Sequence, residues 1–185
     1  MTRYFYDCEF IEDGHTIDLI SIGIVAEDGR DYYAQSVAFE PSSASQWVRE
    51  NVFPHLKTCS TNWPISGFQH VSGQCRHSDC AWRWPSQIAR EVLAFMDIEK
   101  YGKPELWGYY SAYDHVAFCQ LFGTMMDLPS GFPMYTRDIK QWCDTLGNPR
   151  LPEQGKGEHH ALADARHNKV MYEFLAHLER ERVHS

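Results

Sequence analysis

Four acidic residues of this 185-residue chain lie where the neighbouring pattern predicts a side chain turned toward the core. Asp7 and Glu9 belong to the aromatic segment 4–10, which predicts a strand. Alternation places both side chains on one face, with their Cα atoms roughly 7 Å apart. Asp114 begins an apolar stripe of helical spacing, and Asp164 lies on the apolar stripe of the last helical segment. Buried carboxylates repel one another unless a cation lies between them, so the pattern indicates a site for divalent metal ions.

His159 precedes Asp164 by five residues, and a neutral histidine beside a water molecule is a suitable general base near neutral pH. Two divalent ions about 4 Å apart stabilise both the attacking and the leaving oxygen of an in-line phosphoryl displacement. The set is therefore typical of phosphodiester hydrolysis. For Asp7 and Glu9 alone, the alternative is an amphipathic edge strand whose carboxylates face water.

The acids are spread along the chain, so the fold must bring them together. Three apolar or aromatic segments follow one another with short turns between them, which predicts an antiparallel meander over residues 3–11, 17–26 and 31–39. A fourth strand is predicted over residues 104–113, directly before Asp114. A further strand near residues 132–135 stays open.

Helical spacing and capping residues predict the remaining elements. The first predicted helix is capped by Ser43 or Ser45 and ends near residue 53. Further helices are predicted over 86–98, from 114 onward, over 136–146 and over 160–182, and Thr136 is the expected cap of the fourth. Between them, residues 54–84 are rich in Gly, Ser, Cys, His and Pro and predict a long loop. We therefore expect a single α/β domain over residues 1–185.

Composition limits the partners and the compartment. The net charge of −8 argues against a protein that holds long duplex nucleic acid by neutralising phosphates, but it leaves open an enzyme that acts on one strand end. No apolar run approaches the roughly 20 residues of a membrane span, so no membrane partner is expected. The N-terminus enters a strand without a signal-peptide pattern, and six scattered cysteines suit reduced thiols, so we expect a cytoplasmic protein.

Three motifs in order carry a resemblance to a known family. They are Asp7-Cys8-Glu9, Tyr110-Ser111-Ala112-Tyr113-Asp114 and His159-His160-Ala161-Leu162-Ala163-Asp164. The chain resembles the DEDDh 3′→5′ exonucleases, and the segments around Asp114 and Asp164 look most like the small mycobacterial 3′→5′ exoribonuclease branch. The resemblance implies an RNase H-like fold, in which a mixed five-stranded sheet, an antiparallel meander followed by parallel strands, is flanked by helices.

The resemblance also implies roles for individual residues. Asp7 would hold two Mg²⁺ ions, for which Mn²⁺ is expected to substitute, and Glu9 and Asp164 would complete the first of them. Asp114 would act on the second ion, and His159, rather than His160, would be the general base. A single-stranded RNA or DNA 3′ end would be the substrate, and a nucleoside 5′-monophosphate would leave. Some relatives are dimers, which leaves a homodimer open.

At two positions this chain differs from the pattern of the family it resembles, and both differences concern how the substrate is held. Many relatives carry Thr where this chain has Phe10, and many carry Asn where it has Tyr110. Phe10 is a candidate stacking surface for the terminal nucleotide, because ring stacking tolerates any base, and core packing is its alternative role. Ser111, in the second motif, is a second candidate substrate contact.

Alternatives remain at three points. The long loop and its end contain Cys59, Cys75, His77 and Cys80, which are four candidate zinc ligands, although their spacing matches no standard zinc site. The sequence does not decide between RNA and DNA, since recognition of the 2′-hydroxyl depends on loop geometry. A non-catalytic nucleic-acid-binding module on the same fold is the alternative to an enzyme.

Overall fold

One mixed sheet of six strands organises the computed structural model, which describes residues 1–57 and 80–183. The spatial order is β4-β3-β2-β1-β5-β6. The strands are β1 (Thr2–Glu12), β2 (Ile17–Ala26), β3 (Asp31–Ser36), β4 (Trp82–Arg83), β5 (Pro104–Gly108) and β6 (Arg137–Asp138). The first three pair antiparallel, while β5 runs parallel to β1 and β6 parallel to β5. The predicted α/β class and the antiparallel-then-parallel order are confirmed.

The strand count and several boundaries differ from the prediction; among them, β3 ends at Ser36 rather than at residue 39. The two-residue β4 pairs parallel with the outer edge of β3 and adds a sixth strand. The strand left open near residues 132–135 lies instead at Arg137–Asp138. The predicted strand over 104–113 ends at Gly108, because the chain turns at Tyr110 and begins a helix at Ala112.

Six α-helices are described, together with short 3₁₀ turns. They are α1 (Gln46–Asn51), α2 (Pro85–Met96), α3 (Ile98–Tyr101), α4 (Ala112–Gln120), α5 (Ile139–Thr145) and α6 (Ala161–Val183). Of the two serines considered as the cap of α1, Ser45 accepts a hydrogen bond from the Val48 amide. The helix predicted from Thr136 begins three residues later, because the Asp138 carboxylate is its cap.

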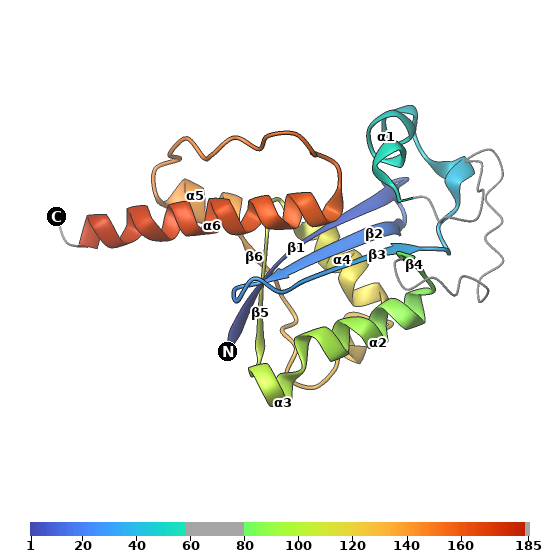
Figure 1. The fold of residues 1–185 in the computed structure, drawn as a ribbon, viewed down its shortest axis with the longest axis horizontal. Helices are drawn as coiled ribbons and strands as arrows, with labels where there is room; N and C mark the ends of the chain where they lie inside the picture. The colour runs from blue at the N-terminus through green and yellow to red at the C-terminus, as the bar shows by residue number, and fades with distance from the viewer. Residues whose placement is uncertain (58–79, 184–185) are drawn as a thin grey trace.

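The sheet is covered on both faces (Figure 1). On one face, alternate residues of β1 pack with α2 and α4 in a core that includes Tyr6, Cys8, Ile88 and Phe118. On the other face α6 lies along β1 and β2, and the Phe5 ring contacts Tyr172 of α6 at 5.0 Å. Because neighbouring residues of a strand face opposite sides, Asp7 and Glu9 face α6 while Cys8 belongs to the core.

Strands β1 and β5 pair only as far as Phe5 and Trp107, and then separate. Beyond that point β1 continues through Asp7 and Glu9, while β5 ends and leads into α4. In open α/β sheets, crevices at the carboxyl ends of parallel strands are common binding places. The separation of these two strands therefore opens a site at the acids.

Helix α6 begins in close contact with β2. A Cβ atom at Gly23 would lie 2.3 Å from the Ala161 carbonyl oxygen and from the Leu162 amide nitrogen. Gly23 is also the residue that pairs with Asp7 across the β1–β2 ladder. The absence of a side chain at this glycine therefore lets the first turn of α6 approach the acids of β1.

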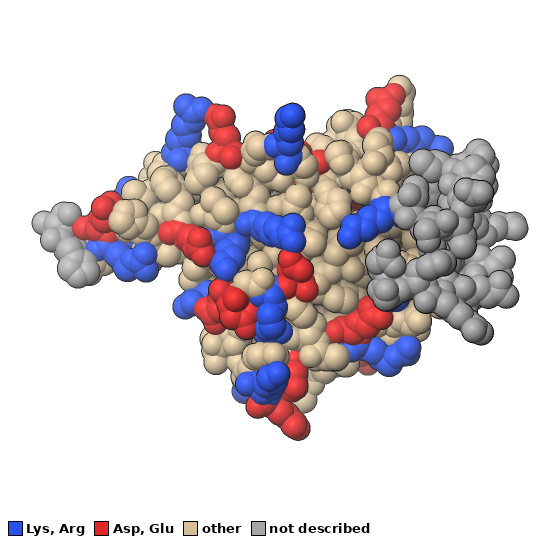
Figure 2. Space-filling view, viewed as in Figure 1, with Lys and Arg blue, Asp and Glu red and all other residues tan. Residues whose placement is uncertain are grey.

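Acidic and basic side chains are interspersed over the face seen in Figure 2. Among the described helices, none is both long and apolar enough to cross a membrane. Three of the four candidate zinc ligands, Cys59, Cys75 and His77, lie outside the described residues, and Cys80 is buried.

Candidate active site

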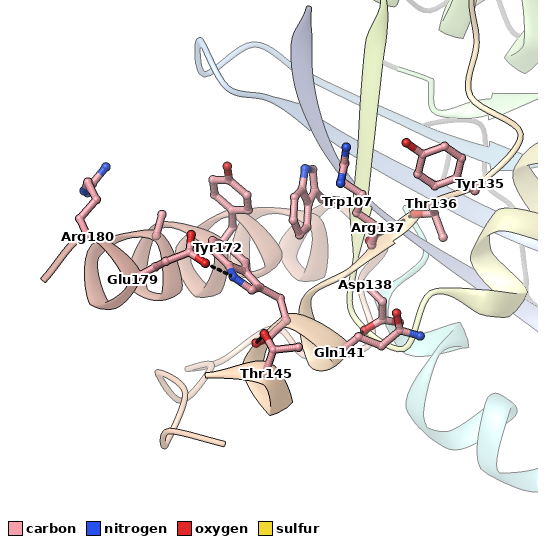
Figure 3. A pocket seen from close by; sticks show the side chains of 12 residues that line it. Trp107, Tyr135, Thr136, Arg137, Asp138, Gln141, Thr145, Tyr172, Glu179 and Arg180 are labelled. Atoms are coloured by element: carbon pink, nitrogen blue, oxygen red, sulfur yellow. Dashed lines mark hydrogen bonds between the residues drawn. The ribbon is translucent and has the colours of Figure 1, made fainter. Parts of the chain in front are cut away.

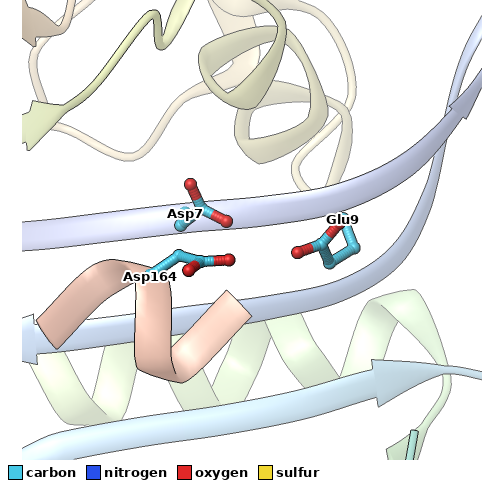
Figure 4. Close-up of side chains that lie close together, drawn as sticks. All are labelled: Asp7, Glu9 and Asp164. Carbon is cyan, nitrogen blue, oxygen red and sulfur yellow. The ribbon is translucent and has the colours of Figure 1, made fainter. Parts of the chain in front are cut away.

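Three carboxylates from two distant parts of the chain converge. Asp7 and Glu9 extend from β1 and Asp164 from the first turn of α6, and the three point toward one another (Figure 4). One oxygen atom of each lies within 4.8 Å of the others. The structure thus brings together three of the four acids that the sequence singled out.

Burial and mutual repulsion make these carboxylates weak acids in the absence of a cation. Burial raises the pKa of Glu9 to about 8, with further contributions from the charges of Asp164 and Asp114. Burial also raises the pKa of Asp7 well above its ordinary value, and the charges of Asp114 and Glu9 add to the effect. A proton or a cation must therefore offset the repulsion in the folded protein.

Asp114 completes the group from the other side of β1. Its Oδ1 atom accepts a hydrogen bond of 2.7 Å from the Cys8 amide. Burial raises the pKa of Asp114 to about 7, although this hydrogen bond lowers it. Asp114 therefore lies beside Asp7, with one oxygen held by β1. We call Asp7, Glu9, Asp114 and Asp164 the acidic site.

The donor set fits divalent cations. Within the described part of the chain, none of the four carboxylates forms an ion pair with Lys or Arg. Hard divalent cations prefer such clusters of carboxylate oxygens. The residues present are therefore suited to hold ions of the Mg²⁺ type.

His159 lies two residues before α6, which begins at Ala161, and close to Asp164. Burial raises the pKa of Asp164, while Gln154 and the neighbouring His159 lower it. The His159 ring meets the indole of Trp47 edge-on, with centroids 4.8 Å apart. His160 takes another role, since its ring stacks on Tyr33 at 4.6 Å and its carbonyl accepts hydrogen bonds from the first turn of α6. Of the two histidines, His159 is the one that contacts Trp47 next to the acidic site.

The two predicted substrate contacts have different surroundings. Phe10 is partly buried against the core, and its ring meets that of the exposed Tyr113 edge-on at 6.0 Å. Ser111 has no exposed surface, and its amide donates a hydrogen bond of 3.0 Å to Asp138. Its burial disfavours the predicted substrate contact, whereas both roles of Phe10 remain compatible with its position.

Two residues near the site were not anticipated from the sequence. Gln154 donates a hydrogen bond to the carboxylate of Asp164 from a polar loop that shows no periodic pattern. Trp47 lies on α1 and is 53% exposed. The sequence marks Trp47 only as a tryptophan among polar residues in a short predicted helix. No sequence pattern marks Gln154.

Two cavities differ in what they present. The larger, about 700 Å³, lies between β6, α5 and α6 and is lined by Trp107, Arg137 and Tyr172 among others (Figure 3). The smaller, about 480 Å³, contains Asp7, Asp164 and Gln154 in its wall. Of these two cavities, the smaller one has residues of the acidic site in its wall. The volume of a cavity therefore does not identify the site in this protein.

Fold and site together define a mixed α/β protein with an acidic site suited to divalent cations. Residues 2–176 match the family model described as the 3′-5′ exoribonuclease Rv2179c-like domain. The chain is 46% identical over 164 residues to proteins named 3′-5′ exoribonuclease Rv2179c and 3′-5′ exoribonuclease MT2234.1, from two strains of Mycobacterium tuberculosis. The match covers 89% of this chain and 87% of each relative. The chain therefore belongs to the Rv2179c-like 3′-5′ exoribonuclease domain family.

Proposed function

We propose that this chain is a metal-dependent 3′→5′ exoribonuclease that removes nucleoside 5′-monophosphates from single-stranded or overhanging 3′ ends. The observation that carries the proposal is the convergence of Asp7, Glu9 and Asp164 within 4.8 Å, with no Lys or Arg paired to them among the described residues. The names of the relatives support the reaction and favour RNA over DNA.

The acidic site would hold two Mg²⁺ ions, or Mn²⁺ in their place. Asp7, on the central strand, would help to hold both ions, Glu9 and Asp164 would help to hold the first, and Asp114 would help to hold the second. When bound, such ions activate water and neutralise charge on a phosphoryl group in an in-line displacement. The backbone amide of Cys8 fixes the orientation of Asp114.

His159 would take a proton from the attacking water on an imidazole nitrogen. Two observations support this role: the His159 ring contacts the indole of Trp47, and His159 is close enough to Asp164 to lower the pKa of that carboxyl. The edge contact with the indole restricts the orientation of the imidazole. Phe10, at the Glu9 end of the acids, would provide a surface for the terminal nucleotide.

The direct test is release of nucleoside monophosphates from matched single-stranded RNA and DNA in Mg²⁺, Mn²⁺ or EDTA. Asp7→Asn should lower the rate on the order of a thousandfold. Asp18→Asn is the matched control, because this carboxylate lies on β2 and accepts a hydrogen bond from the Glu40 amide instead. His159→Ala should lower kcat by about 10²-fold to 10⁴-fold, with the exposed His177→Ala on α6 as its control.

Activity that survives both Asp7→Asn and EDTA would refute the metal-dependent reaction. Binding of single strands without any release of nucleotides would instead identify a non-catalytic module. Faster release from DNA than from RNA would correct the proposed substrate.

A further inference from the structure

Tyr110 lies in a backbone conformation that is unusual for a bulky residue. It connects β5 to α4 with φ of 53°, in the left-handed region that glycine and asparagine enter more readily. Burial does not compensate, because the residue is 63% exposed. Exposed aromatic residues in strained conformations cluster at functional sites, so Tyr110 needs an explanation other than stability.

The surroundings of Tyr110 include a second aromatic ring and a lysine that is ion-paired with Asp144. The Tyr109 ring meets the Tyr110 ring edge-on, with centroids 4.6 Å apart. Lys140, on α5, forms an ion pair with Asp144, and its ammonium group also interacts electrostatically with both Tyr109 and Tyr110. We call Tyr109, Tyr110 and Lys140 the tyrosine platform.

The platform continues into the acidic site. Tyr109 lines the same cavity of about 480 Å³ as Asp7 and Asp164, with Leu151 and Pro152 among the other walls. Along β1 the order is Asp7, Glu9 and then Phe10, so Phe10 lies beyond the Glu9 end of the acids while Tyr109 borders the Asp7 end. A strand held at Phe10 by its terminal nucleotide would leave past the platform.

We propose that the tyrosine platform binds the nucleotide on the 5′ side of the scissile phosphate, with its base against Tyr110 and its backbone phosphate near Lys140. This inference rests on the proposed exonuclease function and adds a second binding site to it. Aromatic rings beside a cation are the usual means of holding a single strand regardless of sequence. The platform would make the enzyme favour oligonucleotides over substrates that have nothing upstream of the scissile bond.

The test compares two substrates in Mn²⁺. One is a five-residue oligouridylate, and the other is the p-nitrophenyl ester of uridine 5′-monophosphate, which has no upstream nucleotide. Tyr110→Gly and Tyr110→Asn remove the ring and suit the left-handed backbone, so both should fold, as thermal unfolding would verify. Tyr110→Phe keeps the stacking ring. Tyr135→Ala is the matched control, an exposed tyrosine that lines the other cavity.

Loss of the Tyr110 ring should raise KM for the oligonucleotide about tenfold and change kcat/KM for the ester less than about twofold. Tyr110→Phe and Tyr135→Ala should stay within about twofold of the wild type on both substrates. Anisotropy of a 5′-labelled oligouridylate in Ca²⁺ should show the same loss of affinity for Tyr110→Gly.

The platform would be refuted if Tyr110→Gly left KM for the oligonucleotide unchanged, or if it lowered kcat/KM equally for the oligonucleotide and the ester. A wild type that hydrolyses neither substrate would refute the exonuclease function instead. The affinities from anisotropy would then test the platform alone: weaker binding by Tyr110→Gly than by the wild type would support it, and equal binding would refute it.

Discussion

Gly23→Ala is the substitution that most directly tests how α6 positions the acidic site. The added Cβ would lie 2.3 Å from the Ala161 oxygen and the Leu162 nitrogen. Both are backbone atoms at the start of α6, so no side-chain rotation can make room. The first turn, which carries Asp164, must therefore move by roughly 1 Å to restore ordinary contact.

A displacement of this size should affect catalysis more than folding. Misplacement of a catalytic group by about 1 Å can lower the rate on the order of 100-fold. Overpacking of a tight contact costs about 1–3 kcal/mol of folding free energy, which a domain of this size can tolerate. We expect Gly23→Ala to fold, to release nucleotides about 100-fold more slowly, and to bind Mn²⁺ more weakly.

Three measurements check this expectation: kcat for nucleotide release, calorimetric titration with Mn²⁺ and urea unfolding. Gly155→Ala is the control, because a Cβ there would meet nothing within 4 Å. A Gly23→Ala protein with near-normal kcat and Mn²⁺ affinity would show that the placement of α6 against β2 does not set the geometry of the acids.

Three further predictions concern the same elements. Gln154→Leu removes the amide that orients Asp164 and should weaken Mn²⁺ binding about tenfold, as measured by calorimetry. Asn168→Leu leaves the Tyr6 carbonyl without its 2.9 Å hydrogen bond from Asn168 Nδ2, and should lower the free energy of unfolding in urea by about 1–3 kcal/mol. The metal-free protein should lose stability as pH rises from 4.5 through about 8, because folding raises the pKa of Glu9 over that window and the folded state therefore binds the proton more tightly. Mg²⁺ competes with that proton, so it should raise the thermal midpoint more at pH 8 than at pH 6, and equal shifts at both pH values would contradict this reasoning.

Much of the central architecture could be predicted from the sequence because it depends on local patterns. The apolar run of β2 has the predicted bounds, Ile17–Ala26, and Asp7, Glu9 and Asp164 were identified by their places on apolar faces. An acid on an apolar stripe is conspicuous because burial without a partner is costly. The same alternation turns Cys8 to the opposite face of β1, where it lies in the core.

Other features depend on contacts that periodicity does not encode. The cap of α5 is Asp138 rather than Thr136, because the Asp138 carboxylate accepts the amides of Lys140 and Gln141. The same carboxylate also accepts the Ser111 amide, a contact across 27 positions of sequence that periodicity does not encode. Gln154 contacts Asp164 from a loop with no regular pattern. The left-handed backbone conformation of Tyr110 could not be predicted either, because tyrosine is not a residue type that favours positive φ.

A bulge in the pairing of β1 with β2 helps to explain how Trp47 comes to lie against His159. The β1–β2 register shifts after Glu9, so that Phe10 pairs with Leu19 rather than with Ile20. Simple alternation would put Ile20 on the same face as Ile22, but the extra residue turns Ile20 to the opposite side. There Ile20 joins the core that anchors α1, and α1 carries Trp47 to the His159 ring. The same irregularity that shifts the pairing register of β1 and β2 thus helps to place α1, and with it Trp47, beside the proposed general base.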